Sequence, residues 1–319
     1  MTTRRALLTR AALLASGAAG LWLVRDRLPW PPLDVRLANG RDTPWMAMSP
    51  GGGLIDLTVA VNGVPIRAIV DSGAQMTAID AEVANRLGLR RPLTAPMLAF
   101  GVSGKPDLTH SVLLDLAMPG LSTPGLHAAA LDLAGVSALS GRDFQMLIGR
   151  DLLRQLVVEA DFPGARVRFL SASAYKSPQD AIYLPLRRRG GAPVVAVKIE
   201  DADPVDVLVD TGSSRLLALS EAAARKVGLL SPGRAQGAAH SVNLGGFSLN
   251  RIVTARSVRI GILDLSAVDI QIYRPAFGAG GPEGLLGAGL FRQFRMGLDL
   301  GGKRLVLVRP PLRVVPPTG

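Results

Sequence analysis

Two aspartates in this 319-residue chain each follow an apolar run and each precede a Ser/Thr-Gly turn. The two segments read Ala68-Ile69-Val70-Asp71-Ser72-Gly73-Ala74 and Val207-Leu208-Val209-Asp210-Thr211-Gly212-Ser213. A carboxylate at the end of a buried strand is unfavourable unless a partner or a reaction uses it. Two carboxyl groups brought together cannot both ionise easily, so one keeps a proton while the other is charged. Such a pair predicts general acid–base chemistry on a bound water.

The similarity of the two halves extends beyond these turns. Two later segments correspond to each other: Met146-Leu147-Ile148-Gly149-Arg150-Asp151-Leu152-Leu153 and Gly284-Leu285-Leu286-Gly287-Ala288-Gly289-Leu290-Phe291. The offset between the halves is 139 residues at the two aspartates and 138 residues at Gly149 and Gly287. An offset that is constant to within one residue indicates an internal duplication.

The elements around the two aspartates are predicted to be mainly β. Runs such as 54–61 and 194–199 have the composition of strands, and Asn62-Gly63 after the first run is typical of a hairpin. Each aspartate leads through a second strand to an N-cap residue, Asp80 or Ser220, and then to a short helix that ends at a glycine. Matching halves of this kind can bring their aspartates together at a pseudo-two-fold axis.

These residues resemble the retropepsin-like aspartic proteases. Half of that signature is Asp-Ser/Thr-Gly-Ala/Ser after an apolar strand, and the other half is the segment 147–153, which is close to the retroviral form. More specifically, the chain looks like the bacterial exported members that carry two retropepsin-like lobes in one polypeptide, over residues 50–309. The resemblance implies a mainly β fold of two homologous β-barrel lobes with short helices, related by a pseudo-two-fold axis.

The resemblance also implies a role for each motif residue. The predicted catalytic pair is Asp71 and Asp210, one from each lobe, so that a monomer is sufficient for a complete site. The predicted supporting residues are the hydroxyls of Ser72 and Thr211, which brace the two turns, Gly73 and Gly212, which permit the tight turns, and Gly149 and Gly287, which lie beneath the turns where a side chain would collide.

A substrate-covering flap is expected between the helix and the apolar-apolar-Gly segment of each lobe. The first-lobe candidate lies in segment 98–106 and comprises Phe100, Gly101, Val102, Ser103 and Gly104, with glycine at a hairpin tip. The second-lobe counterpart is segment 236–242. Two ordinary surface hairpins are the alternative interpretation.

The chain departs from the retroviral pattern at several positions. An acid usually stands four residues after the catalytic Asp and pairs with the Arg of the Gly-Arg-Asx motif, but these positions are Gln75 and Ser214 here. The second lobe has Ala288 in place of the arginine, so Arg150 is expected to use another partner. The flap tyrosine of the pepsin type is also missing, because none of the three tyrosines lies in the candidate flap, so the lobes are closer to retropepsin than to pepsin.

Composition excludes several other kinds of hydrolase. The chain has no cysteine and three histidines, none in a close ligand spacing, so we expect no thiol chemistry, no metal and no cofactor. No Gly-x-Ser-x-Gly sequence of the serine hydrolases is present.

The net charge of +11 is spread over separate arginine clusters, and aromatic residues are only 4% of the chain. We therefore expect a diffuse basic surface and no nucleic acid partner.

The N-terminal region has the form of an export segment. Arg4-Arg5 precedes the apolar run 11–24 and resembles a twin-arginine signal. The predicted organisation is an export signal or N-terminal anchor over 1–28, a linker over 29–50, lobes over 51–175 and 176–309, and a Pro-rich tail over 310–319. The expected location is the periplasm, either free or tethered to the membrane through the N-terminus and facing the periplasm.

Three functions are compatible with these observations. The first is an aspartic endopeptidase that cleaves a peptide or unfolded protein in a cleft between the lobes. The second is a catalytically inactive protease-fold protein that binds peptides or envelope components. The third is a basic surface-binding protein that has lost proteolysis. Retention of both Asp71 and Asp210 favours the first.

Overall fold

The computed structural model describes residues 33–49, 53–92, 97–99, 107–140, 142–243, 246–274 and 281–310. About half of the chain is β-strand and only about a tenth is helix, so the predicted mainly β fold class is confirmed. The chain divides into a short N-terminal unit up to Leu33 and one large unit from Asp34 onward. The candidate export segment lies outside the described residues.

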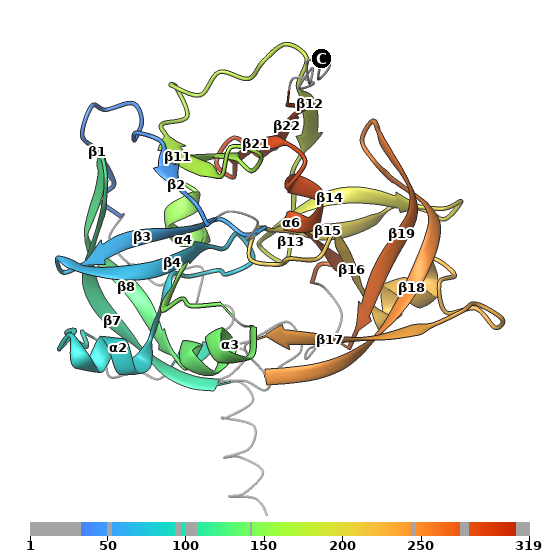
Figure 1. The fold of residues 1–319 in the computed structure, drawn as a ribbon, viewed down its shortest axis with the longest axis horizontal. Helices are drawn as coiled ribbons and strands as arrows, with labels where there is room; N and C mark the ends of the chain where they lie inside the picture. The colour runs from blue at the N-terminus through green and yellow to red at the C-terminus, as the bar shows by residue number, and fades with distance from the viewer. Residues whose placement is uncertain are drawn as a thin grey trace, which may run out of the picture. The chain divides into compact units, whose positions relative to one another are not determined.

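The first lobe is a closed barrel of six strands (Figure 1). Pairing between β7 and β8 closes the ring, and the short strands β1 (Arg36–Leu37) and β6 (Met97–Ala99) extend its edges. The barrel strands are β3 (Asp56–Val61), β4 (Val64–Val70), β5 (Ala78–Asp80), β7 (Asp107–Met118), β8 (Leu121–Leu131) and β9 (Met146–Ile148).

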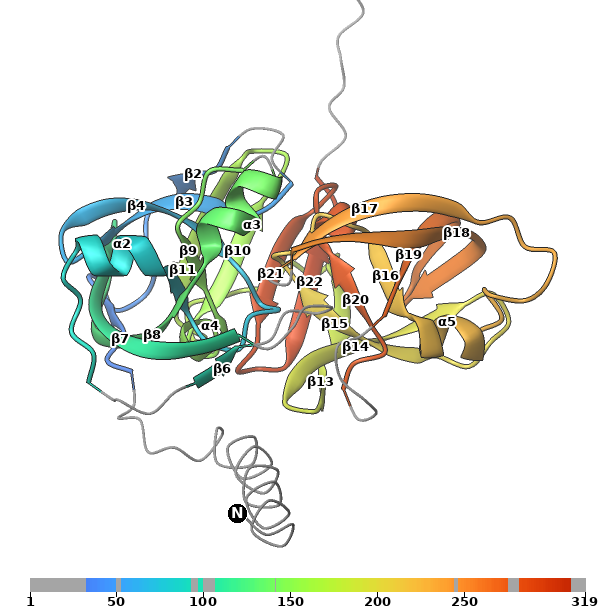
Figure 2. The same cartoon turned by 90° about the horizontal axis from the view of Figure 1, so that it is seen from below.

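The second lobe repeats this order of strands. Pairing between β14 and β18 closes its barrel, and β13 (Arg187–Arg189) and β17 (Gly237–Asn243) extend the edges. The barrel strands are β14 (Ala192–Ile199), β15 (Val205–Asp210), β16 (Leu217–Ser220), β18 (Gly246–Ile260), β19 (Leu263–Tyr273) and β20 (Gly284–Gly287). Figure 2 separates this yellow-to-orange lobe from the blue-to-green first lobe.

A six-stranded sheet joins the two lobes. Its order is β12 (Ile182–Pro185), β22 (Arg304–Val308), β21 (Arg295–Asp299), β10 (Val157–Asp161), β11 (Arg166–Leu170) and β2 (Met46–Ala47). The central pair, β10 and β21, is antiparallel, with Val157 opposite Asp299 and Asp161 opposite Arg295. Because Val157 and Arg295 are equivalent in the duplication, this register has the symmetry of a two-fold axis through the sheet.

Short helices follow equivalent strands in both lobes. Asp80 and Ser220 cap α2 (Ala81–Arg86) and α5 (Glu221–Lys226), as the sequence predicted, and α4 (Arg150–Leu153) and α6 (Ala288–Phe291) follow the two apolar-apolar-Gly strands. A further helix, α3 (Leu133–Ser140), lies between β8 and β9 of the first lobe. One carboxylate caps two helices, because Asp80 Oδ1 accepts N–H groups of α2 and its Oδ2 accepts those of Leu133 and Ala134.

The segment predicted as a linker, 29–50, instead contributes to the folded unit from Asp34 onward. Its strands β1 and β2 pair with β8 and β11. The Thr43 hydroxyl accepts the N–H of Phe169 at 3.0 Å, and Met46 is buried. Arg166 and Arg168 both stack on Trp45 at 4.6 Å. Pro44, the one proline of this segment that the structure describes, lies between β1 and β2, and these two strands pair with β8 and β11.

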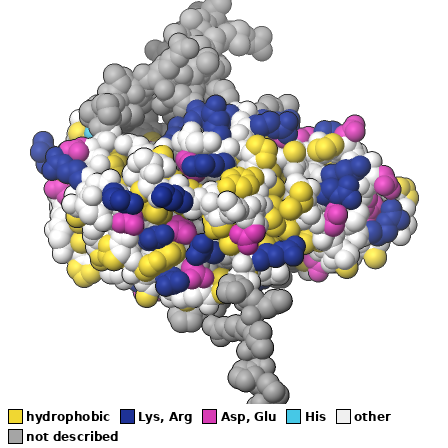
Figure 3. Space-filling view, turned by 90° about the horizontal axis from the view of Figure 1, so that it is seen from above, with side chains coloured by type: hydrophobic (Ala, Val, Ile, Leu, Met, Phe, Trp, Pro, Cys, Tyr) yellow, Lys and Arg dark blue, Asp and Glu magenta, His cyan; other side chains and the backbone are white. Residues whose placement is uncertain are grey.

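Charged residues are interspersed on the surface. Figure 3 shows arginine and lysine side chains next to acidic and hydrophobic ones, with no uniform basic field on that face. Among the residues that the structure describes, none of the helices combines the length and apolar character needed to span a bilayer.

Candidate active site

The two aspartates stand at the ends of equivalent barrel strands. Asp71 follows β4, which runs parallel to β9, and Asp210 ends β15, which runs parallel to β20. The Asp71 N–H donates to the carbonyl of Ile148 at 2.9 Å, which fixes the start of the turn. Each aspartate is thus delivered by one strand and held against a second.

The two carboxyl groups lie next to each other. Asp71 Oδ1 accepts the N–H groups of Gly73 at 2.8 Å and Ala74 at 3.0 Å, and Asp210 Oδ1 accepts the N–H of Gly212 at 2.9 Å. Each glycine faces the opposite carboxyl group. A Cβ at Gly73 would lie 2.6 Å from Asp210 Oδ1, and a Cβ at Gly212 would lie 2.5 Å from Asp71 Cγ. Glycine is therefore required by the close approach of the lobes.

The environment raises the pKa of both carboxyl groups. Burial is the largest cause for each, and Asp210 is only 7% exposed. The pKa of Asp210 is raised well above its ordinary value because the charge of Asp71 adds to the effect of burial. Two backbone N–H groups and a hydrogen bond from Asp210 partly offset the effect of burial on the pKa of Asp71. The pair therefore favours the state with one shared proton.

Hydroxyl groups brace the two turns across the lobe junction. Thr211 Oγ1 accepts the Ser72 N–H at 2.9 Å and donates to the Val70 carbonyl at 2.7 Å. Reciprocally, Ser72 Oγ accepts the Thr211 N–H at 3.0 Å and donates to the Val209 carbonyl at 2.7 Å. Both side chains are fully buried, so these four bonds are shielded from water.

The two downstream glycines lie directly beneath the turns. A Cβ at Gly149 would lie 2.3 Å from the Met76 carbonyl carbon, and a Cβ at Gly287 would lie 2.4 Å from the Arg215 carbonyl oxygen. Both contacts are with backbone atoms, which cannot move aside as a flexible side chain can. A side chain at either position would displace the loop that follows an aspartate.

The arginine and the acid of the Gly-Arg-Asp segment have separate roles. Arg150 Nη1 donates to the carbonyl of Ser72 at 3.3 Å, which supplies a partner in place of the missing acid at position 75. The Asp151 carboxylate accepts both the N–H and the hydroxyl of Thr77, at 2.8 to 3.0 Å. The second lobe has Gly289 at the position of Asp151, and its hypothetical Cβ would lie 2.4 Å from the backbone nitrogen of Leu216. At this position, side-chain bonds support the loop in the first lobe, whereas the second lobe has close backbone packing.

Sequence reasoning missed Tyr273 as a neighbour of the site. This residue ends β19 and is 8% exposed. Burial and the charge of Asp210 both raise the pKa of its phenol. Its ring packs in a small apolar cluster with Leu208 and Leu285, which precede Asp210 and Gly287 by two residues. The sequence carried no signal for it, since the contact depends on how β19 lies beside β16.

The candidate flap residues Phe100, Gly101, Val102, Ser103 and Gly104 lie outside the described residues. The strands on either side of them, β6 and β7, form an antiparallel pair with Ala99 opposite Asp107. In the second lobe, segment 236–242 falls largely on β17, which forms a long hairpin with β18. The described strands at both candidates are paired as in a hairpin, which fits a flap and an ordinary surface hairpin equally, so the flap stays a prediction.

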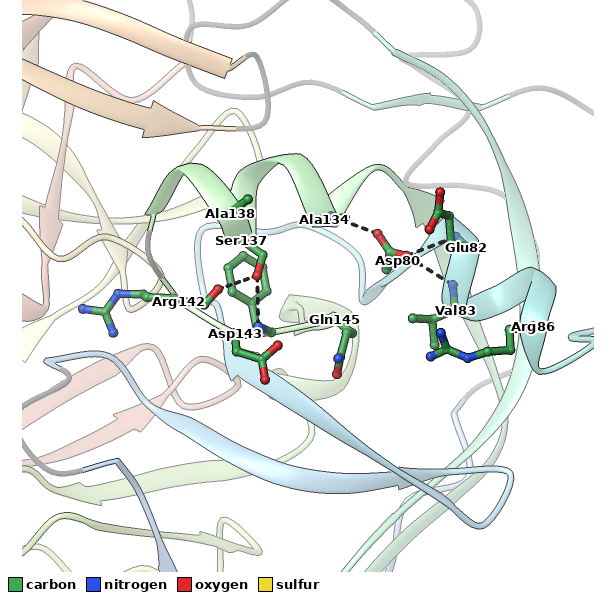
Figure 4. Close-up of a pocket in the computed structure, with 11 residues that line it drawn as sticks. Asp80, Glu82, Val83, Arg86, Ala134, Ser137, Ala138, Arg142, Asp143 and Gln145 are labelled. Atoms are coloured by element: carbon green, nitrogen blue, oxygen red, sulfur yellow. Dashed lines mark hydrogen bonds between the residues drawn. The ribbon is translucent and has the colours of Figure 1, made fainter.

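A separate cavity of about 510 Å³ opens on the first lobe between α2, α3 and residues 142–145 (Figure 4). Its wall includes the capping carboxylate of Asp80 and the charged side chains of Glu82, Arg86 and Asp143. None of its lining residues belongs to the turns that carry Asp71 or Asp210. Within the described ranges, no cluster of three or more acidic or histidine side chains could hold a metal ion.

Comparisons with known proteins place the chain in a family. The family described as "Aspartyl protease" matches twice, over residues 57–152 and 195–290, one match in each lobe. Similar proteins include DNA damage-inducible protein 1 of Cryptococcus neoformans, 29% identical over 44% of this chain, and the UBA domain-containing protein Mud1 of Schizosaccharomyces pombe, 34% identical over 32% of this chain. The aligned parts cover only 31% and 29% of those two proteins.

Among solved structures, the crystal structure of a retropepsin-like aspartic protease from Rickettsia conorii aligns with a TM-score of 0.32 and 21% identity, over 42% of this chain and 95% of that chain. The two family matches, one per lobe, confirm the predicted resemblance and the internal duplication. Together they span more than half of the sequence, and the chain therefore belongs to the aspartyl protease family.

Proposed function

We propose that this protein is an aspartic endopeptidase that hydrolyses peptide bonds with a water activated between Asp71 and Asp210. The observation that carries the proposal is the pair of adjacent carboxyl groups, with Asp210 buried and Asp71 half-buried, each in a turn braced by the other lobe. Burial and mutual repulsion favour one proton for the pair, which is the state that acid–base hydrolysis needs.

The chemistry follows from that shared proton. The charged carboxylate takes a proton from the water as it attacks the scissile carbonyl, and the neutral carboxyl group donates to the carbonyl oxygen. The roles then exchange, so that the amine leaves with a proton and the pair returns to its starting state. The substrate we propose is a peptide or an unfolded protein in an extended conformation, which can add its backbone to strand edges at the cleft. One chain supplies both aspartates, so a monomer is sufficient.

Turnover of a mixed peptide library from about pH 3 to pH 7, the range in which such a pair can share a proton, tests the proposal. The wild type is compared with Asp71→Asn and Asp210→Asn, which keep the size of each side chain. Loss of cleavage in both variants would support the mechanism. Cleavage that persists in both would refute the dyad, and a folded wild type that binds peptides without cutting them would favour the inactive binding protein.

We also propose that the protein acts outside the cytoplasm, either released into the periplasm or tethered by its N-terminus. This rests on Arg4-Arg5 and the apolar run 11–24, which lie outside the described residues. Fractionation of cells that express the full chain, with and without Arg4→Lys and Arg5→Lys together, tests it, since a twin-arginine signal requires both arginines.

A further inference from the structure

Arg150 binds the turn that carries Asp71 at two places. The residue begins α4 directly after Gly149 and is only 6% exposed. Its backbone N–H donates to the carbonyl of Ala74 at 3.0 Å, and its Nη1 donates to the carbonyl of Ser72 at 3.3 Å. Arg150 thus binds the carbonyl groups of the two residues on either side of Gly73.

The second lobe contains an internal comparison for this arrangement. Ala288 occupies the equivalent position, and its N–H donates to the carbonyl of Ser213 at 2.8 Å. The backbone bond beneath the turn is therefore present in both lobes, but the guanidinium is present in only one. Among the described residues, the duplication has left one buried arginine, Arg150, whose charge acts on both carboxyl groups.

The charge of Arg150 acts on both carboxyl groups. Burial, the largest cause, raises the pKa of both Asp71 and Asp210, and the charge of Arg150 is a smaller cause that opposes this rise at each carboxyl group. Burial and, to a smaller extent, the charge of Asp210 raise the pKa of Tyr273 at the end of β19. The neighbouring Asp151 is bonded to Thr77, from which its carboxylate accepts two hydrogen bonds.

We propose that Arg150 is a positioning residue for the dyad: it holds the Asp71 turn through the Ser72 and Ala74 carbonyls and places a buried positive charge at that turn. That charge favours the ionised form of one carboxyl group and so opposes the effect of burial. This rests on the proposed function, because it specifies how the dyad is set for acid–base chemistry. Substitutions at position 150 can separate the hydrogen-bonding role from the role of the charge. Lysine would keep the charge but lose the planar donor geometry, and methionine would lose both.

The first test is the pH dependence of kcat/KM for the wild type, Arg150→Met and Arg150→Lys. For the methionine variant, both limbs of the profile are expected to move to higher pH. Well below the wild-type midpoint, where the acid limb has unit slope, kcat/KM should then fall about threefold for a displacement of half a pH unit. For the lysine variant, the limbs should stay in place while kcat falls. A methionine profile with unmoved limbs would overturn the proposal.

The matched control is Arg154→Met, one turn further along. Its side chain donates to the carbonyl of Gly191 at 3.2 Å, in the connection between β13 and β14. This variant also loses a cation near α4, but its limbs should coincide with those of the wild type. If Arg150→Met does not fold, Arg150→Lys alone decides, because displaced limbs in a variant that keeps the charge would contradict the electrostatic role.

The second test does not depend on turnover. Both aspartates have a raised pKa in the folded state, so folding takes up protons. The stability that this contributes is fully present at low pH. It is lost as pH rises above about 4 and through the pKa values of the folded state. Without Arg150 this loss should become steeper and extend to higher pH. In a background with both aspartates changed to asparagine, Arg150→Met should leave the pH dependence unaltered. If wild type shows no turnover, the proposed function fails, but this measurement still decides the role of Arg150: equal slopes in the presence of the aspartates would overturn it.

Discussion

Replacing Thr211 with valine tests the brace between the lobes directly. Valine has almost the same shape as threonine, so the change removes two hydrogen bonds without opening a cavity. The Ser72 N–H loses its acceptor at 2.9 Å, and the Val70 carbonyl loses its donor at 2.7 Å. Both side chains of the brace are fully buried, so water cannot replace the lost partners.

The magnitude follows from the two orphaned groups. A buried donor or acceptor left without a partner costs about 1–3 kcal/mol, so Thr211→Val should lower the free energy of unfolding by about 2–6 kcal/mol. Ser72→Ala removes the reciprocal pair of bonds, to the Thr211 N–H and the Val209 carbonyl, and should have a cost of similar size. Because the turns hold the carboxyl groups, both variants should also lower kcat by a larger factor than they raise KM.

Urea unfolding of purified wild type and variants measures the effect, with the slope against denaturant checked for each. The control is Thr58→Val on the exposed face of β3, which should change the free energy of unfolding by no more than about 0.5 kcal/mol. A loss below about 1 kcal/mol for Thr211→Val with an unchanged slope would refute the view that these bonds hold the lobes in register.

Three further predictions concern other parts of the structure. Gly149→Ala should cost about 3 kcal/mol or more in urea unfolding because its Cβ would meet backbone, whereas Gly281→Ala, with nothing within 4 Å, should be nearly neutral. Asp80→Ala should lower the free energy of unfolding about twice as much as Ser220→Ala, since Asp80 caps two helices and Ser220 caps one; equal costs would contradict the double cap. Three arginines hold the pKa of Glu221 at about 2, so its contribution to stability is present above about pH 4.5 and is lost as pH falls towards 2; Glu221→Gln should flatten that decline in acid unfolding, more clearly at low salt than at high salt.

The sequence determined the fold class and the pairing of motifs. Two apolar runs that each deliver an Asp into a Ser/Thr-Gly turn, with a nearly constant offset to a second Gly motif, predicted two equivalent lobes, and the family matches confirm them. Local signals also fixed the ends of the short helices. Asp80 and Ser220 cap α2 and α5 because their side chains satisfy N–H groups that a helix start leaves unpaired.

Local signals were less informative where short segments pair with distant ones. The segment 29–50 looks like a linker because it is rich in proline, yet Met46 and Thr43 are buried against β11. A strand of two residues has no periodicity to recognise. Its formation depends on an open sheet edge more than a hundred residues away in the chain.

Tertiary structure alone decided the electrostatics of the candidate site. The sequence placed Asp71 and Asp210 in equivalent turns, but the direction of each pKa depends on burial, on the number of N–H groups at each carboxyl group and on Arg150. The sequence showed that Arg150 lacks the usual acid partner, but not that it reaches the Ser72 carbonyl. The proximity of Tyr273 to Asp210 likewise depends on the pairing of β16 with β19. The spacing of motifs in the sequence shows which residues a strand carries. The desolvation of each carboxyl group and the charges near it depend instead on which strands pack around it.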